Sequence, residues 1–256
     1  MTLADLTPAP PGFKKIDFHI HTHFSACYVD DIKPEANRRT RPEEILQAAL
    51  DAGVDAIAVT DHNGVEMVQP LRDLAKGTGL TILPGTELST RGGHCLAVFD
   101  VDADLEPIRE MLIDVGFPQK VWGDGFKRTD MWMDEVIDHI ARRGGIAIGA
   151  HVDREPRGFI ASDERHSDKL RIYTSPNLSA LEITDPRKRE KWNSGADLRY
   201  KQPRACIQSS DAHAPEEIGR RPVFLKMDGV SLDGIRTALA AYRESILFPA
   251  DVAAAS

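Results

Sequence analysis

Two short motifs in this chain are built from residue types that bind metal ions. His19 and His21 stand two residues apart, and Asp211 and His213 stand two residues apart about 190 residues later. In a β-strand, residues i and i+2 point to the same face, so each motif can present two side chains to one site. Imidazole and carboxylate groups suit Zn, Mn and Fe. One metal cluster would explain both motifs.

Further imidazole and carboxylate side chains follow the apolar segments between these motifs. His62 ends one apolar run, Glu87 follows the next, and His94 and His151 border two more. Strand ends are where active sites collect in parallel α/β proteins. Each oxygen of a carboxylate such as Glu87 can donate to one metal. Two ions about 3.5–4 Å apart can share a hydroxide that attacks phosphorus, and can neutralise charge on the phosphoryl oxygens.

Together these segments resemble the motifs of the polymerase and histidinol phosphatase (PHP) superfamily of metal-dependent phosphoesterases. The resemblance extends from about residue 15 to residue 240, in the family's order, and its pieces are 19–22, 60–63, 85–89, His94, 150–151 and 210–213. Each piece alone is short, but six in order rarely coincide by chance. The resemblance implies an α/β fold, a distorted seven-stranded β/α barrel of one domain, and two or three divalent ions of Mn, Zn or Fe.

The resemblance also implies how the ligands are shared among the metals. One ion would be held by His19, His21, Glu87 and Asp211, a second by Glu87, His94 and His151, and a third by His62, His213 and one more residue. Glu87, Asp211, His213 and Asp61 would belong to the catalytic centre. Asp61 is adjacent to His62, and adjacent strand residues point to opposite faces. We therefore expect Asp61 to orient a ligand imidazole rather than to bind metal.

The loop after His21 departs from the family pattern. Many relatives place Asp or His five or six residues after the second histidine of the first motif, where this chain has Ala26 and Cys27. Cys27 could complete the third site as a thiolate, which favours Zn. Asp30 or Asp31 could reach the site instead, or the centre could hold only two metals firmly.

Arginine side chains are the expected partners of a substrate phosphate, because the guanidinium fork matches phosphate oxygens. Arg220 and Arg221 follow His213, and Arg154 and Arg157 follow His151. Each could equally be a solvated surface arginine. The polar segments 117–128 and 152–177 interrupt the pattern of strands and helices, and we expect them to form walls or lids over the metals.

Composition limits the classes of protein without selecting one. The chain has 256 residues, a formal charge of −8 and three cysteines, too few for a disulfide framework. No apolar run approaches the roughly 18 residues needed to span a bilayer, and the first residues do not resemble a secretory signal. We therefore expect a cytoplasmic protein without a membrane partner. A basic run at 187–204, with Trp192 and Tyr200 interleaved, leaves nucleic acid as an alternative partner.

Strand and helix signals alternate along the chain, which predicts a mainly parallel sheet. The expected domain is 13–248, with tails at 1–12 and 249–256. We expect strands at 15–20, 54–60, 80–83, 95–99, 146–150, 180–184 and 205–209, with 223–227 as the candidate for an eighth. The expected helices are 41–50, 67–76, 104–115, 129–143 and 231–239.

The favoured function is hydrolysis of a phosphoester on a small metabolite or nucleotide. The alternatives are a phosphodiesterase or exonuclease acting on nucleic-acid ends, and a non-catalytic metal-binding module. A C–N hydrolase of amidohydrolase type would more typically use a bridging lysine, and no lysine stands at a predicted strand end. The chain also has no P-loop sequence.

Overall fold

The computed structural model describes residues 7–28, 41–155 and 158–255. These residues form a mixed nine-stranded sheet in the order β7-β6-β5-β4-β3-β2-β1-β8-β9. The strands are β1 (Phe13–Ile20), β2 (Ala56–Val59), β3 (Thr81–Thr90), β4 (Gly93–Val98), β5 (Ile146–Gly149), β6 (Leu178–Glu182), β7 (Cys206–Ile207), β8 (Val223–Lys226) and β9 (Ile246–Leu247).

The sheet curls into a nearly closed barrel, because the segment after β7 returns to β1. Ile20 forms a parallel bridge with Ala212, and the His21 N–H donates to the Ala212 carbonyl at 2.9 Å. The first half of β1 pairs instead with β8, and β8 pairs with β9, both antiparallel. The predicted barrel fold is confirmed. Its nine strands exceed the predicted seven because β8 and β9 extend the sheet beyond β1.

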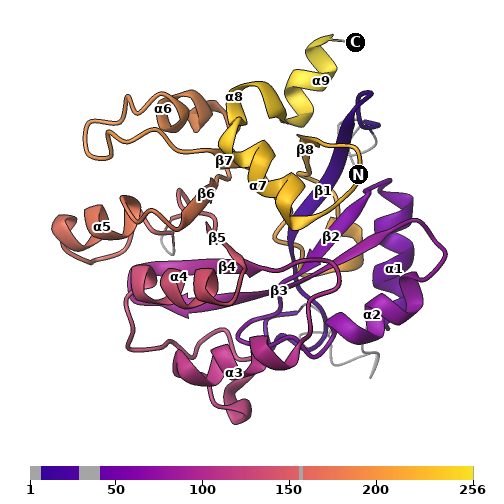
Figure 1. Cartoon of the computed structure of the whole chain (residues 1–256), viewed down its shortest axis with the longest axis horizontal. Helices are drawn as coiled ribbons and strands as arrows, with labels where there is room; N and C mark the ends of the chain where they lie inside the picture. Colours follow the sequence, from indigo (N-terminus) through magenta and orange to yellow (C-terminus); the bar gives the residue numbers. More distant parts are fainter. Residues whose placement is uncertain (1–6, 29–40, 156–157, 256) are drawn as a thin grey trace.

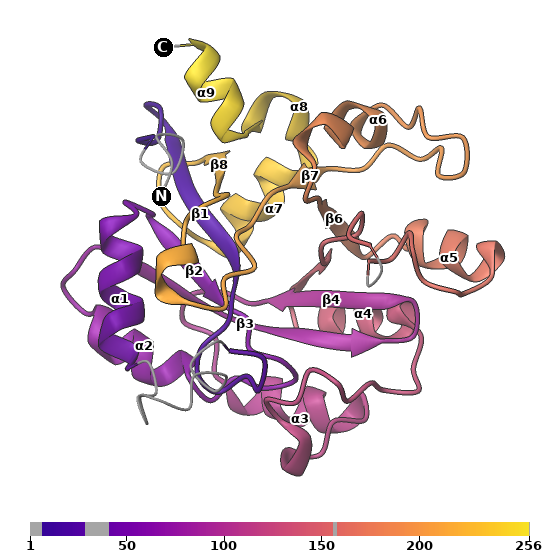
Figure 2. The same ribbon diagram turned by 180° about the vertical axis from the view of Figure 1, so that it is seen from behind.

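Helices surround the sheet (Figures 1 and 2). The longer ones are α1 (Pro42–Asp51), α2 (Val68–Ala75), α3 (Glu106–Asp114), α4 (Met133–Arg142), α5 (His166–Tyr173) and α7 (Leu232–Ala240). Shorter ones are α6 (Arg189–Asn193), α8 (Tyr242–Ser245) and α9 (Pro249–Ala255). Five of these match the predicted helices, with α4 starting later than predicted. Helix α9 occupies most of the predicted tail 249–256.

Strand β3 is longer than predicted, and this decides where Glu87 lies. The expected strand at 80–83 continues to Thr90 and forms an antiparallel hairpin with β4, which projects from the barrel in Figure 2. Thr86, Glu87, Ser89 and Thr90 are polar yet buried. Their polarity ended the predicted strand too early. Glu87 therefore lies within a strand, where side chains from the segments on both sides of that strand can approach its carboxylate.

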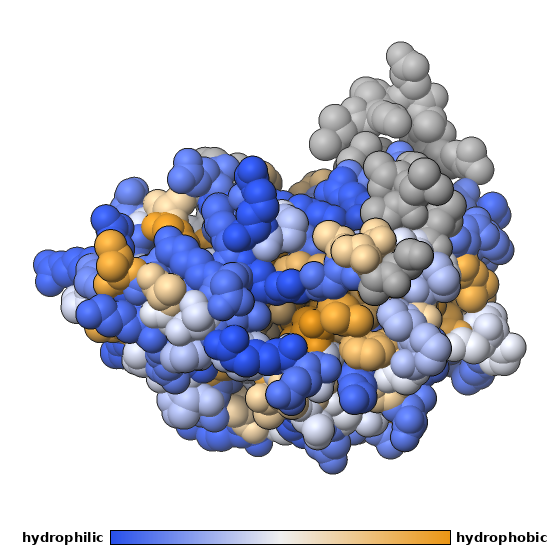
Figure 3. All heavy atoms as spheres, turned by 90° about the horizontal axis from the view of Figure 1, so that it is seen from above, coloured by the Kyte–Doolittle hydropathy of each residue, from blue (hydrophilic) through white to orange (hydrophobic). Residues whose placement is uncertain are grey.

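Buried apolar side chains of the strands and of the helices packed on them form one continuous core. The face seen in Figure 3 is mostly hydrophilic. Among the described residues, the large exposed apolar side chains are Ile113, Phe126, Leu170 and Leu198. Within the described residues, no helix is both long enough and apolar enough to span a membrane.

Candidate metal centre

The Glu87 carboxylate lies at the middle of the histidine cluster and faces it with both oxygens. Its Oε2 is 3.4 Å from His19 Nε2, 3.4 Å from His21 Nε2 and 3.1 Å from His62 Nδ1. Its Oε1 is 2.7 Å from His94 Nδ1 and 3.0 Å from His151 Nε2. The carboxyl group is buried, with only 1% of the side chain exposed. This is the arrangement expected of a carboxylate that bridges two cations.

On one side of Glu87, ring nitrogens and carboxylate oxygens that carry lone pairs lie close to one another. His19 Nε2 is 3.2 Å from His21 Nε2 and 3.3 Å from Asp211 Oδ1. His19 Nδ1 lies 3.0 Å from the Glu182 carboxylate, which only accepts hydrogen bonds, so Nδ1 is the protonated nitrogen. The opposite nitrogen of the neutral ring then carries a lone pair that faces another imidazole and two carboxylate oxygens. These hydrogen-bond acceptors repel one another unless a cation lies between them. The residues therefore fit a metal ion.

His21 is oriented in the same way through Ser25. The Ser25 hydroxyl donates to Asp61 Oδ1 at 2.6 Å and lies 3.3 Å from His21 Nδ1, from which it can only accept. Asp61 also accepts from the backbone N–H and the hydroxyl of Thr22 at 2.8 and 2.7 Å. The structure therefore places Asp61 behind the histidines, where it positions the loop after β1.

Burial and the nearby carboxylates shift the pKa values of the inner and outer imidazoles in opposite directions. Burial opposes a charge on His21, but hydrogen bonds to Asp211 and Glu87 outweigh it and raise the pKa of His21 to about 9. At the periphery the balance reverses, and burial lowers the pKa of His62 to about 3 in spite of the nearby Glu87. Positive charge is thus favoured where His19, His21, Glu87 and Asp211 meet, which is where a metal ion would sit.

Two of the residues brought together have an unusual backbone conformation. Asp211 has φ +52° and His151 has φ +29°, in the left-handed region that non-glycine residues rarely adopt. Each follows the end of a short strand, and the His151 N–H is held by Glu182 Oε2 at 3.0 Å. This turn directs both side chains back over the barrel.

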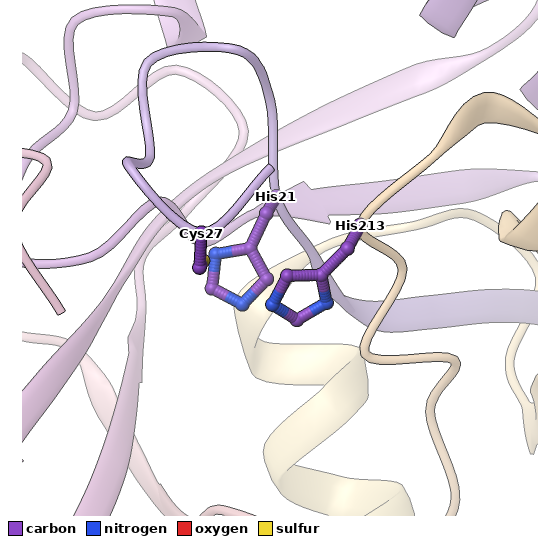
Figure 4. Close-up of side chains that lie close together, drawn as sticks. All are labelled: His21, Cys27 and His213. Atoms are coloured by element: carbon purple, nitrogen blue, oxygen red, sulfur yellow. The ribbon is translucent and has the colours of Figure 1, made fainter. Parts of the chain in front are cut away.

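Four groups of residues within the described chain could hold a metal ion. They are His19–His21–Asp211, His21–His62–Glu87, Glu87–His94–His151 and His21–Cys27–His213. The last group lies at the outer side of the centre, where Cys27 comes from the loop after β1 and His213 from the segment after β7 (Figure 4). Of the three residues considered for completing the third site, Asp30 and Asp31 lie outside the described residues. Cys27 is placed beside His213 and His21, whereas His62 is grouped with Glu87.

Sequence patterns did not identify two buried carboxylates that organise the centre. Glu182 ends β6 and joins His19 to the His151 backbone. Asp17 lies on β1 and accepts from the N–H groups of Ser210 and Gly219 at 2.9 and 2.8 Å, which ties the closing segment to the first strand. Position at a strand end was a usable signal for Glu182. None was available for Asp17, because its partners are backbone groups about 200 residues away.

The predicted phosphate-binding arginines take different positions. Arg154 pairs with the Asp211 carboxylate, and 37% of its side chain is exposed. Arg220 and Arg221 both donate to the Ser210 carbonyl, at 3.0 and 2.8 Å, and so brace the loop that carries Asp211. Arg157 lies outside the described residues. Arg154 alone of the described three contacts a predicted metal ligand by its side chain.

The two irregular segments meet at a cavity beside the centre. Gly125, Phe126 and Arg128 of the first and Ser162, Asp163 and Glu164 of the second line a cavity of about 420 Å³ that includes His94. A larger cavity of about 730 Å³ lies between α4 and α5 and includes none of the predicted site residues. Access from the smaller cavity leads to the Glu87–His94–His151 side of the centre.

Comparisons with known proteins support the fold. The chain matches solved structures of a lesion-specific endonuclease Q from Pyrococcus furiosus, with TM-score 0.68, 19% identity, and coverage of 92% of this chain and 57% of that one. It also matches a Bacteroides vulgatus two-domain protein described as containing a predicted PHP-like metal-dependent phosphoesterase, with TM-score 0.63, 19% identity, and coverage of 94% and 67%. A further endonuclease Q structure holds a 27-mer duplex with an abasic lesion at the active site.

Among curated sequences, a PolC-type DNA polymerase III of Streptococcus sanguinis is 31% identical over 107 residues, which are 41% of this chain and 7% of the polymerase. The chain thus corresponds to a small part of that polymerase and to just over half of the endonuclease. No family model matches the sequence. The chain therefore shares its fold with endonuclease Q and with the protein described as containing a predicted PHP-like metal-dependent phosphoesterase.

Proposed function

We propose that this protein is a metal-dependent phosphoesterase whose reaction takes place at the Glu87 centre. The observation that carries the proposal is the position of Glu87, whose two oxygens face two separate groups of nitrogen ligands. Two ions held on either side of this carboxylate would lie close enough to act on one phosphoryl group. The identity of the ions as Mn, Zn or Fe, and their number as two or three, are part of the proposal.

When bound, divalent ions supply an activated water molecule and neutralise charge that develops on the phosphoryl oxygens. The protein's own contribution is to fix the ligands. Glu182 and Ser25 hold the N–H tautomers of His19 and His21, so that both Nε2 atoms point to the centre. His213 is oriented likewise, because its Nδ1 lies 2.9 Å from the Asp211 carbonyl and its Nε2 is left unprotonated.

Substrate would approach the side where the ligands are partly exposed. The side chains of His94 and His213 are 23% and 25% exposed, whereas those of His19 and His21 are buried. Arg154 contacts the Asp211 carboxylate and is 37% exposed, and its guanidinium group can donate two parallel hydrogen bonds to phosphate oxygens. We propose Arg154 as the phosphate contact, with Arg220 and Arg221 acting behind it on the Ser210 loop.

For the substrate, we propose a phosphorylated small molecule or nucleotide, with nucleic acid as the second candidate. The abasic duplex in an endonuclease Q structure favours the second. The basic run at 187–204 does not supply it with a phosphate-binding surface, because acidic partners neutralise most of the run. The pairs are Arg187–Asp185, Lys188–Asp153, Arg189–Asp251 and Lys191–Asp197, and Arg204 donates to buried carbonyls.

The test is a phosphate-release and strand-cleavage screen of the protein loaded with Mn, Zn or Fe. Substrates would include mononucleotides, sugar phosphates, short oligonucleotides and a duplex with one abasic site. We expect turnover that Asp211→Ala abolishes and that Asp228→Ala, at an exposed position, leaves unchanged. Absence of turnover with every substrate, in protein shown to contain metal, would contradict a hydrolytic function.

A further inference from the structure

Loop 123–127 is fixed to the metal centre at several points. The Gly123 N–H donates to the His62 carbonyl at 2.8 Å, and its carbonyl accepts from the Ala26 N–H at 2.8 Å. The Asn63 amide donates to the carbonyls of Asp124 and Lys127 at 2.9 and 3.2 Å. With both ends of the loop held by backbone and side-chain hydrogen bonds, the residues between them have a defined position relative to the histidines.

Within this loop, Gly125 lies directly against a predicted metal ligand. A Cβ atom at Gly125 would be 2.4 Å from His62 Cδ2 and 2.5 Å from His62 Nε2, so the close approach requires glycine. The Ser89 hydroxyl also donates to the Gly125 carbonyl, at 3.2 Å. The next residue, Phe126, is therefore carried at the rim of the centre by backbone that touches it.

Phe126 is 77% exposed, although the backbone on either side of it is held by hydrogen bonds. Of the four large exposed apolar side chains in the described chain, it is the one that lines the cavity containing His94. The volume of about 420 Å³ lies within the roughly 300–1,000 Å³ of small-molecule sites. An aromatic face presented beside metal ligands provides a surface on which a planar ring can stack.

The other side chains of this cavity add polar contacts. Arg128 lines it and makes no side-chain hydrogen bond or ion pair with any described residue, so its guanidinium group is available to a phosphate. Asp163 and Glu164 line the opposite part, and Glu164 is 3.8 Å from Arg91. Carboxylates that line the same cavity as Phe126 can accept hydrogen bonds from the amino and hydroxyl groups of a nucleoside.

We propose that Phe126 stacks on a nucleobase of the substrate while the adjacent phosphate lies at the metal centre. This inference rests on the proposed function and specifies its substrate as a nucleotide or the end of a nucleic-acid strand rather than a sugar phosphate. Arg128 contacts a further phosphate when the substrate has one. Phe126 is thus a specificity residue that distinguishes substrates with a base from those without.

The experiment measures binding, so that it does not depend on turnover. Metal-loaded protein is titrated calorimetrically with a nucleoside 5′-phosphonate, in which carbon replaces the ester oxygen, and with the matching ribose phosphonate lacking the base. Loss of a base–aromatic stack corresponds to about 1–3 kcal/mol, which is roughly a 5- to 150-fold rise in Kd. We expect Phe126→Ala to raise Kd by such a factor for the nucleoside ligand alone.

Two variants control the interpretation. Phe126→Trp keeps an aromatic face and should retain the affinity, whereas Leu198→Ala removes another exposed apolar side chain and should change neither Kd. Equal Kd values of the parent for the two ligands, or an equal effect of Phe126→Ala on both, would overturn the inference but leave the proposed function standing. Failure of the parent to bind either ligand would also overturn it, and the phosphate-release screen would then decide the proposed function separately.

Discussion

At the scale of single residues, the centre depends on which nitrogen of each imidazole carries its proton. His19 and His21 turn their Nε2 atoms toward Glu87 because a carboxylate and a hydroxyl hold the Nδ1 sides of their rings. Residues that never touch the metal can therefore control its affinity. Glu182 is the clearest case, since one carboxylate oxygen holds both His19 Nδ1 and the His151 N–H.

Glu182→Gln should weaken metal binding and lower activity by about 10- to 100-fold, the usual effect of losing a partner behind a ligand histidine. The amide keeps the shape of the side chain but loses its charge and can present an N–H to His19. Competitive titration with a chromogenic chelator measures the affinity. Glu190→Gln, at an exposed position, is the matched control. Equal metal affinities of Glu182→Gln and the control would remove Glu182 from this role.

Cys27 lies close to His21 and His213 and is the described candidate for completing the proposed third metal position. We expect the outermost ion to leave at a lower chelator concentration than the other two, because two imidazoles with water bind less tightly than a site with an added anionic ligand. If the Cys27 thiolate instead completes the ligand shell, the outermost ion should be held as tightly as the other two. In that case Cys27→Ala should reduce the metal count by one ion per chain. Stepwise chelation with metal counting checks this. Three ions leaving the parent together, with no change in Cys27→Ala, would show that the loop plays no such part.

At the scale of elements, the short strands end in residues that turn sharply toward the centre. Asn63 follows β2 with φ +51°, donates to two carbonyls of loop 123–127 and accepts from the Ser89 N–H at 3.3 Å. One side chain thereby joins β2, β3 and the loop that carries Phe126. The left-handed conformation places this amide where all three segments meet.

Asn63→Ala should lower the free energy of unfolding by about 2–4 kcal/mol, since it leaves buried groups unpaired and places alanine at positive φ. Asn63→Gly loses the same hydrogen bonds but tolerates the conformation, so it should be less destabilised than the alanine variant. Urea denaturation of both variants measures the difference. A glycine variant as unstable as the alanine variant would show that the backbone conformation contributes nothing.

Most helices and strands could be predicted from the sequence because their buried apolar residues recur at regular spacing or form a continuous run. Strand β2 is an apolar run that polar site residues follow, β1 carries His19 near its end, and α7 begins at the N-cap Ser231. The second half of β3 could not be predicted, since its buried side chains are polar and are satisfied only by the folded site. Helix α5 has a weak apolar face, so the segment 152–177 gave no helical signal.

The metal-binding residues were predicted on residue type and order, and the structure brings all eight into one cluster or its immediate surroundings. Their assignment as ligands stays a prediction. Residue spacing could not predict the side chains that hold these residues in position. Glu182 and Asp17 act through partners far away in the sequence, and the guanidinium groups of Arg220 and Arg221 bind the backbone carbonyl of Ser210, a contact that residue spacing does not predict.

At the scale of the whole molecule, the barrel is closed by the segment between β7 and η5 (Pro215–Glu217), which also carries Asp211 and His213. Asp17 holds this segment through Ser210 and holds the residues after η5 through Gly219. Burial raises the pKa of the Asp17 carboxyl group despite these hydrogen bonds. Closure of the fold and assembly of the metal centre therefore depend on the same contacts.

Asp17→Ala should lower the free energy of unfolding by about 2–4 kcal/mol, because two buried N–H groups lose their acceptor. Metal affinity should fall with it, since the Asp211 segment is no longer held. Asp17→Asn retains an acceptor oxygen and should recover part of both losses. Thermal unfolding with and without added metal gives the two readouts. Unchanged metal affinity in a destabilised Asp17→Ala protein would separate closure from metal binding.

The most direct test of the account is the number of divalent ions in purified, metal-replete protein, measured by mass spectrometry of the elements against protein concentration. The account predicts at least two ions per chain in the parent, and fewer in Glu87→Ala, because the bridging carboxylate faces both groups of ligands. One ion or none in the parent, or an unchanged count in Glu87→Ala, would contradict the central claim that Glu87 joins two metals.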